Sequence, residues 1–327
     1  MKRALFRQHG NPSAVLEVVT EPDPVPGPGQ VRVRLRVMTI NPADLLSIEG
    51  RYGAEPLALP ATPGVGGWGI VDAVGEGVKR LAVGDAVLPL GPGQWADTLV
   101  VHERMAPKAP PGADPEQAAL MRANPATAEL MLSDIVPLRH GDWVVQNAAN
   151  SAVGRLVIRF ARERGLHTVN IVRRADVVDG LRAEGADAVI VDDGGDLPAA
   201  ILAATGGIRP RLALDAIGGR ATAALASAVA TGGTVAVYGL LSGQAPQAEA
   251  RDLVFRDVHI RGFWLAAWYC AADPEAIRDL HAGLAARLAR GETHQAVEAR
   301  YPLDRVADAV VHAARPGRNG KIMLTAG

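Results

Sequence analysis

Residues 143–154, WVVQNAANSAVG, combine an apolar run, a turn of small residues and the start of a helix. Such a turn can hold a pyrophosphate, because backbone N–H groups and the helix dipole both face the anion. In the G-x-G-x-x-G form of this loop the glycines allow a tight turn and close phosphate approach, and here those places hold Ala149, Ser151 and Gly154. The segment predicts a dinucleotide site, with an ordinary strand-to-helix turn of another α/β protein as the alternative.

Two arginines follow the next predicted strand, residues 168–172. A dinucleotide-binding fold usually has an acidic residue near the end of this strand, where it holds the ribose hydroxyls of NAD. Arg173 and Arg174 stand there instead, and guanidinium groups bind phosphate oxygens in a bidentate manner. The pair predicts NADPH rather than NADH as cofactor. The alternative is two solvated arginines at the entry to a helix.

Composition and charge exclude several classes of protein. The 327 residues include 34 Lys and Arg against 35 Asp and Glu, so no overall field draws the chain to nucleic acid or to an anionic membrane. Cys270 is the single cysteine and the eight histidines show no metal spacing, so we expect no metal site and no intramolecular disulfide. The N-terminus lacks the apolar core of a signal peptide, and no stretch reaches about 18 uncharged apolar residues. We therefore expect a soluble, cytoplasmic protein.

The pattern of apolar residues divides the chain into two regions. The first third alternates short strand-like runs with Pro and Gly, which predicts a small, bent, largely antiparallel domain. Its expected strands are 31–37, 70–73, 86–89 and 98–101. After about residue 115, strands alternate with helices, which predicts a parallel sheet covered on both faces. Six strands are expected there, at 143–146, 168–172, 188–191, 212–215, 234–238 and 258–263. The tail predicts one long amphipathic helix from about Asp273 and a strand at 321–324.

Several longer motifs resemble one superfamily. WVVQNAANSAVG, NIVRR, VAVYGLLSG and FRDVHIRGFWLAAW together resemble the medium-chain dehydrogenases/reductases. INPADLLSIEGRYG, LPATPG and ANPATA resemble, more narrowly, the zinc-free trans-2-enoyl thioester reductases of the mitochondrial type. The resemblance implies an α/β fold with a GroES-like, mostly β catalytic domain at 1–118, to which 265–327 return. It also implies a Rossmann doubly wound parallel-sheet domain at 119–264 that binds NADPH, and a homodimer formed by pairing of the last Rossmann strands.

The same resemblance implies roles for single residues. Tyr52, in the turn 50–53, matches the family's proton donor. Hydride addition to the β-carbon of an enoyl thioester leaves an enolate, which a phenol of pKa about 10 can both hydrogen-bond and protonate. The implied substrate pocket contains Asn41, Trp68 and Trp264. The implied cofactor contacts are Asn124, Asn150, Ser151, Ala152, Val153, Gly154, Arg173, Arg174, Tyr238, Gly239, Leu240, Leu241, Phe263, Trp264, Leu265 and Lys321.

Departures from the family pattern bear on the substrate. Gly66 stands where the family usually carries a Glu, and Ala175 stands where its clamp has a second arginine. We expect Trp68 and Trp95 to narrow or reshape the mouth of the cleft. The leading hypothesis is an NADPH-dependent 2-enoyl thioester reductase. An NADPH:quinone or enone oxidoreductase of the same fold, which needs no acid, and a non-catalytic NADPH-binding sensor are the alternatives.

Overall fold

The computed structural model describes residues 1–326 and divides into two compact units. Unit 1 comprises Met1–Ala123 and the chain from Gly283 onward, and unit 2 comprises Asn124–Ala282. The sequence-based ranges instead assigned 119–123 to the second domain and 265–282 to the first. Trp268 joins its segment to unit 2, because its Nε1 donates to Asp134 Oδ2 at 2.9 Å. Among residues 1–326, no helix has the length and apolar character needed to cross a membrane.

A six-stranded parallel sheet forms the centre of unit 2. Its strands are β7 (Trp143–Gln146), β8 (His167–Val172), β9 (Ala188–Val191), β10 (Leu212–Asp215), β11 (Thr234–Val237) and β12 (His259–Gly262). The order β12-β11-β10-β7-β8-β9 confirms the predicted doubly wound sheet. The strand order reverses between β7 and β10, and ligands of such sheets bind outside the carboxyl ends of the strands at this point.

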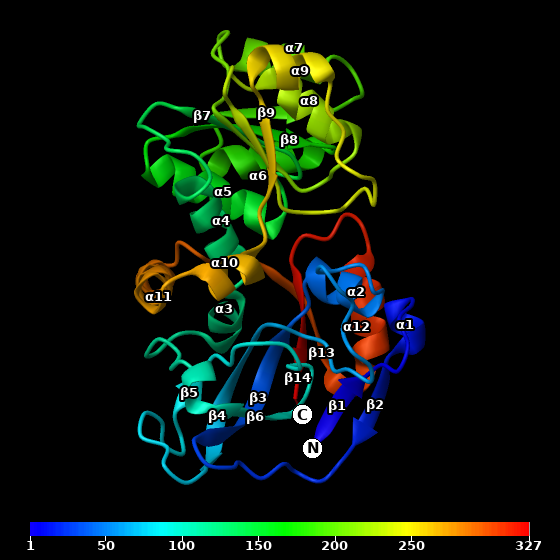
Figure 1. The fold of residues 1–327 in the computed structure, drawn as a ribbon, viewed down its shortest axis with the longest axis vertical. Coiled ribbons are helices and arrows are strands. Elements are labelled where there is room, and N and C mark those ends of the chain that lie inside the picture. Colours follow the sequence, from blue (N-terminus) through cyan, green and yellow to red (C-terminus); the bar gives the residue numbers. More distant parts are fainter. Residues whose placement is uncertain (327) are drawn as a thin grey trace. The chain divides into compact units, whose positions relative to one another are not determined.

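Helices lie on both faces of this sheet (Figure 1). The helices that unit 2 contains are α4 (Asn124–Ser133), α5 (Ala152–Glu163), α6 (Val178–Ala183), α7 (Leu197–Ala204), α8 (Arg220–Ala228), α9 (Ala250–Arg256) and α10 (Leu265–Ala271), with a 3-10 turn at Ala175–Val177. The long helix α11 (Pro274–Ala289) crosses the boundary between the units. One apolar cluster joins the sheet to α7 and α8, and a second joins it to α5 and α6.

Unit 1 is built on a mostly antiparallel sheet of order β13-β14-β3-β4-β5, with β6 also paired to β3. Its strands are β3 (Gln30–Thr39), β4 (Gly67–Val74), β5 (Ala86–Val87), β6 (Thr98–His102), β13 (Val297–Pro302) and β14 (Lys321–Thr325), and β1 (Lys2–Leu5) pairs separately with β2 (Glu17–Thr20). The four strands expected in the first third are confirmed as β3 to β6. Unit 1 also contains α1 (Pro12–Val15), α2 (Pro42–Ile48), α3 (Pro115–Leu120) and α12 (Val306–Ala314), with 3-10 turns at Glu103–Met105 and Leu303–Arg305.

The tail holds more structure than its sequence pattern predicted. The expected helix and strand are present as α11 and β14, but β13 and α12 lie between them. Val306, Ala309 and Val310 of α12 are buried in the core of unit 1. The apolar residues of this short helix therefore complete the core, and β13 extends the sheet by pairing in parallel with β14.

Trp95 belongs to the core of unit 1 and does not shape the mouth of a cleft, so that expectation was wrong. Its side chain is fully buried and its Nε1 donates to Thr39 O at 2.9 Å. A Cβ built on Gly64 would lie 2.2 Å from Trp95 Cδ1, so the indole fills the space left by that glycine. Trp68 is half-buried on β4 and packs against a small cluster that includes Leu120 and Met323.

Candidate functional site

The start of α5 presents two hydrogen-bond donors without acceptors. Ser151 is the N-cap, and its Oγ accepts from Gly154 N at 3.1 Å. Among residues 1–326, no group accepts from the N–H of Ala152 or of Val153. α5 is 12 residues long, so its dipole adds partial positive charge at this end. The residues present therefore suit an anionic group such as a pyrophosphate.

Close packing keeps the turn before α5 compact. A Cβ built on Gly154 would lie 2.4 Å from Ala149 O, a backbone atom that cannot move aside cheaply. Gln146, which is fully buried, donates from Nε2 to Gly154 O at 2.9 Å and to Asn170 Oδ1 at 2.7 Å. Of the three loop positions, Gly154 is the one where glycine is required by packing. Asn150 is half-buried in the same turn.

Tyr238 follows β11 and brings a buried hydroxyl to the region of Ser151. No hydrogen bond of normal geometry reaches that hydroxyl from residues 1–326, although the Ser151 side chain lies near enough for a weak hydrogen-bond interaction that lowers the pKa of the phenol. Burial raises the pKa of the Tyr238 phenol, so it stays a donor. A Cβ on the next residue, Gly239, would lie 2.5 Å from Ala216 O, and Leu240 and Leu241 beyond it are exposed.

Arg173 and Arg174 differ in their surroundings at the end of β8. Arg173 is exposed, and no residue from 1 to 326 forms an ion pair or hydrogen bond with its side chain. Arg174 donates from Nε and Nη2 to the two carboxylate oxygens of Asp176, each at 3.0 Å. A 2'-phosphate would compete with Asp176 for Arg174, but exposed pairs of this kind contribute little stability. Binding of the 2'-phosphate by these two arginines therefore stays a prediction.

Tyr52 lies in a turn that continues from the end of α2. Arg51 N donates to Leu46 O at 2.8 Å, and Gly50 N donates to Ser47 O at 3.2 Å. Gly50 has a φ of 73°, and a Cβ there would lie 3.0 Å from His9 Cγ, so this turn requires a glycine. The Tyr52 side chain is half-buried.

A buried polar cluster holds the other end of α2. Lys321 Nζ donates to Asn41 Oδ1 at 2.7 Å, although the two residues are 280 positions apart. Asn41 Nδ2 donates to Thr39 Oγ1 at 3.0 Å, and Asp44 Oδ2 accepts from Asn41 N at 2.7 Å. Burial raises the pKa of Asp44 to about 7 and lowers the pKa of Lys321 to about 8, while the attraction between the two opposes both shifts. We call Thr39, Asn41, Asp44 and Lys321 the α2 cluster.

The remaining predicted residues have ordinary positions. Asn124 begins α4 and is half-buried, and Phe263 follows β12. Trp264, 43% exposed, is the N-cap of α10, and Leu265 is the first residue of that helix. Gly66 leaves no room for the family's carboxylate, because a Cβ there would lie 2.5 Å from Thr39 Oγ1. Of the predicted residues, the structure joins Asn41 to Lys321 and Ser151 to Gly154, and the roles of all of them stay predictions.

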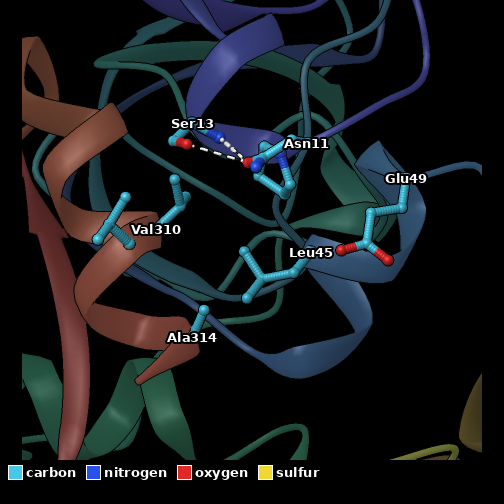
Figure 2. A pocket seen from close by; sticks show the side chains of 8 residues that line it. Asn11, Ser13, Leu45, Glu49, Val310 and Ala314 are labelled. Carbon is cyan, nitrogen blue, oxygen red and sulfur yellow. Dashed lines mark hydrogen bonds between the residues drawn. The ribbon is translucent and has the colours of Figure 1, made fainter. Parts of the chain in front are cut away.

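A hollow of about 500 Å³ lies between α1, α2 and α12 in unit 1. Figure 2 shows Leu45 and Val310 on opposite sides of it, with Glu49 at one end and Asn11 hydrogen-bonded to Ser13. Glu49 is paired with Arg51 at 3.0 Å. None of the predicted site residues lines this hollow, so we do not assign the candidate chemistry to it.

The sequence interpretation missed Asp44 and Thr39. One signal for Asp44 was present, since Asn41-Pro42-Ala43-Asp44 has the pattern of a helix start with a cap and an acid three residues later. Nothing local predicts that Lys321 meets them. In the part of the chain from 1 to 326, no three His, Cys, Asp or Glu side chains gather in a group that could hold a metal ion. The expected independence from zinc stays a prediction.

Comparisons with known proteins agree with this architecture. Residues 27–111 match the family described as alcohol dehydrogenase GroES-like domain, and residues 152–282 match the family described as zinc-binding dehydrogenase. The human mitochondrial enoyl-[acyl-carrier-protein] reductase is 34% identical over 99% of this chain and 88% of its own length.

Two solved structures share the fold. A Bacillus thuringiensis protein assigned as an NADPH:quinone reductase is 32% identical, with a TM-score of 0.92 over 100% of this chain and 99% of its own. Escherichia coli quinone oxidoreductase, solved in complex with NADPH, is 23% identical, with a TM-score of 0.90 over 99% of this chain and 100% of its own, which shows the fold alone. The chain therefore belongs to the medium-chain dehydrogenase/reductase superfamily of oxidoreductases and, within it, to the family of the mitochondrial enoyl-[acyl-carrier-protein] reductases.

Proposed function

We propose that the protein is an NADPH-dependent reductase of an activated carbon–carbon double bond, with a 2-enoyl thioester as its substrate. The observation that carries the proposal is the start of α5, where two N–H donors have no acceptor within residues 1–326 in a chain of this family. Such a start suits the pyrophosphate of a nicotinamide dinucleotide. The curated relatives at about 34% identity are enoyl-[acyl-carrier-protein] reductases, which supports the choice of substrate.

The cofactor would be held mainly by unit 2. The N–H groups of Ala152 and Val153 would bind the pyrophosphate, and Arg173 together with Arg174 would bind the 2'-phosphate. The relative from Bacillus thuringiensis, assigned as an NADPH:quinone reductase, supports NADPH over NADH. When bound, NADPH supplies the hydride that adds to the β-carbon of the substrate.

Tyr52 would supply the proton that completes the reduction. Hydride addition leaves an enolate with negative charge shared between the α-carbon and the thioester oxygen. The Tyr52 hydroxyl would hydrogen-bond that charge and transfer its proton to the α-carbon, and the resulting phenolate would recover a proton from water. The backbone hydrogen bonds that join this turn to α2 hold Tyr52 in place.

Steady-state kinetics with crotonyl-CoA and NADPH test the proposal. We expect turnover by the native protein, and a kcat about 100-fold lower in Tyr52→Phe because general acid catalysis contributes about 10² or more. Tyr301→Phe is the matched control in the same unit. Tyr301 is on β13, and its hydroxyl lies 3.0 Å from His312 Nδ1, so we expect its kcat to stay within about twofold of the native value. An inactive native protein, or a fully active Tyr52→Phe, would contradict the proposal.

A quinone reductase is the second candidate, and the assigned activity of the Bacillus thuringiensis relative favours it. A quinone accepts hydride without an acid catalyst, so Tyr52→Phe would leave quinone turnover unchanged. Turnover of crotonyl-CoA and of a benzoquinone, each measured with the native protein and with Tyr52→Phe, therefore separates the two candidates.

Pairing of two copies through β12 is part of the proposal. This strand pairs only with β11 among the strands of residues 1–326, so its other edge is open. The helix before it, α9, exposes Leu253, Val254 and Phe255, the last by 82%. A homodimer would cover such apolar surface. A cytoplasmic location stays a prediction.

A further inference from the structure

We infer that Asp215 and Asn147 are positioning residues for the cofactor, and that they set the spacing between its two predicted binding segments in unit 2. One segment, residues 150–154, contains the turn before α5 and the start of that helix, and the other is residues 238–241 after β11. Neither Asp215 nor Asn147 is among the predicted cofactor contacts. The inference rests on the proposed function, because it assigns these residues a role toward NADPH.

The Asp215 side chain joins the ends of two neighbouring strands. Asp215 is the fully buried last residue of β10, and its Oδ1 accepts from Nδ2 of Asn147, which follows β7, at 2.7 Å. The same oxygen accepts from Ile217 N at 2.8 Å and from Gly218 N at 3.0 Å. Because a backbone N–H only donates, the Asn147 atom that meets Ala216 N at 2.8 Å must be the amide oxygen, and the amide nitrogen must face Asp215. These bonds hold the turn after β7 against the loop after β10.

Asn147 leads directly into the turn before α5. The next residue, Ala148, has a φ of 48°, which is a costly conformation for a residue with a Cβ and persists where neighbouring contacts hold it. The two side-chain bonds of Asn147 supply such contacts. Ala148 O accepts in turn from N of Ser151, the N-cap of α5, at 2.9 Å. The position of the Ala152 and Val153 N–H groups relative to β10 therefore depends on Asn147.

The end of β10 and the loop after it also hold the segment after β11. Asp215 O accepts from Tyr238 N at 2.9 Å, and Ala216 O accepts from Leu241 N at 3.1 Å. Asp215 thus connects both predicted cofactor segments, one through its side chain and the other through its backbone. The connection lies at the carboxyl ends of the strands where the strand order reverses, which is where ligands of such sheets bind.

The role of Asp215 depends on its hydrogen bonds rather than on its charge. Within residues 1–326 its carboxylate bonds to Asn147, to two backbone N–H groups and to Thr222 of α8, whose Oγ1 donates to Asp215 Oδ2 at 2.5 Å. All these partners are neutral. An asparagine could keep the whole pattern, because its oxygen accepts from the same donors and its nitrogen can donate to the Thr222 hydroxyl. Asp215→Asn should therefore keep the two segments in place, whereas Asp215→Ala removes the connection.

Fluorescence titration with NADPH tests the inference on four variants of the full chain. We expect the Kd for NADPH to rise about tenfold in Asp215→Ala and in Asn147→Ala, and to return to within about twofold of the native value in Asp215→Asn. Thr222→Val is the matched control, because it removes a buried bond to Asp215 Oδ2 and leaves the bonds to Oδ1 intact. Thermal unfolding should show losses of stability in Thr222→Val and Asn147→Ala, while the Kd of Thr222→Val stays within about twofold of the native value.

Three results would overturn the inference. The first is a native Kd in Asn147→Ala, and the second is an Asp215→Asn variant that binds NADPH as weakly as Asp215→Ala. The third is an equal loss of affinity in Thr222→Val and Asn147→Ala, because the losses would then follow stability rather than the turn before α5. If Asp215→Ala does not fold, the comparison of Asn147→Ala with Thr222→Val still decides. A native protein that does not bind NADPH would instead contradict the proposed function, so the two failures are distinct.

Discussion

The two units hold their candidate chemistry in different ways. In unit 2 the groups that suit an anion are backbone N–H groups of consecutive residues at the start of α5. In unit 1 the α2 cluster depends on Asn41 meeting Lys321, 280 residues later in the chain. The first arrangement is set by local sequence, and the second forms only when the tail folds back onto β3. Sequence motifs can therefore predict the former and not the latter.

Of the substitutions that probe this difference, the one expected to act most strongly changes the local arrangement in unit 2. Gly154→Ala places a Cβ 2.4 Å from Ala149 O, so the turn must shift and its N–H groups lose their alignment. We expect NADPH affinity to fall at least about tenfold and the protein to lose about 1–3 kcal/mol of stability. Isothermal titration and thermal unfolding measure both quantities.

Gly283→Ala is the matched control for that substitution. It lies inside α11 with nothing within 4 Å of an added Cβ. We expect unchanged NADPH affinity and a stability gain of up to about 1 kcal/mol. Equal NADPH affinity in both glycine variants would show that the turn before α5 does not bind the cofactor.

An intermediate effect is expected at the end of β8. Arg173→Ala/Arg174→Ala removes both guanidinium groups, and we expect it to weaken NADPH binding about tenfold or more while leaving NADH binding nearly unchanged. Arg173→Ala alone should account for most of the loss, because Arg174 already pairs with Asp176. Parallel titrations with the two nucleotides check this, and a native protein that binds both equally would argue against the clamp.

The smallest expected effect concerns the pH dependence of stability in unit 1. Burial raises the pKa of Asp44 from 3.8 to about 7, so the folded state holds a proton that the unfolded state releases. The contribution of Asp44 to stability is therefore present below about pH 4 and is lost as pH rises to about 7. Asp44→Asn should gain at least about 1 kcal/mol relative to the native protein over that range. Urea unfolding at pH 4.5 and 7 measures the change, and parallel pH curves would contradict it.

The sequence predicted the elements of unit 2 better than those of unit 1 for a physical reason. The six strands of unit 2 are short apolar runs buried on both sides, and their pattern is visible without knowing their partners. In unit 1, β13 is half exposed, with polar residues at alternate positions, and α12 is only nine residues long. Trp95 shows a further limit, since its indole fills the space above Gly64 and nothing local distinguishes that role from a place at a cleft.

The candidate site was predictable only in part, because many of its side chains contact residues that are distant in the sequence. Gly154 follows from the loop pattern, and the structure supplies the reason in the close approach of Ala149 O. Arg174 and Asp176 are only two residues apart in the sequence, so their ion pair could have been predicted from sequence. The contact of Lys321 with Asn41 could not, because it requires β14 to pair with β3.

Transfer of deuterium from NADPH to crotonyl-CoA is the most direct test of enoyl reduction by this protein. NADPH carrying deuterium at the transferable C4 position would be mixed with crotonyl-CoA and the protein, and the butyryl product examined by NMR. We expect deuterium at the β-carbon and a solvent-derived hydrogen at the α-carbon. A product without deuterium, or with deuterium at the α-carbon, would contradict this expectation.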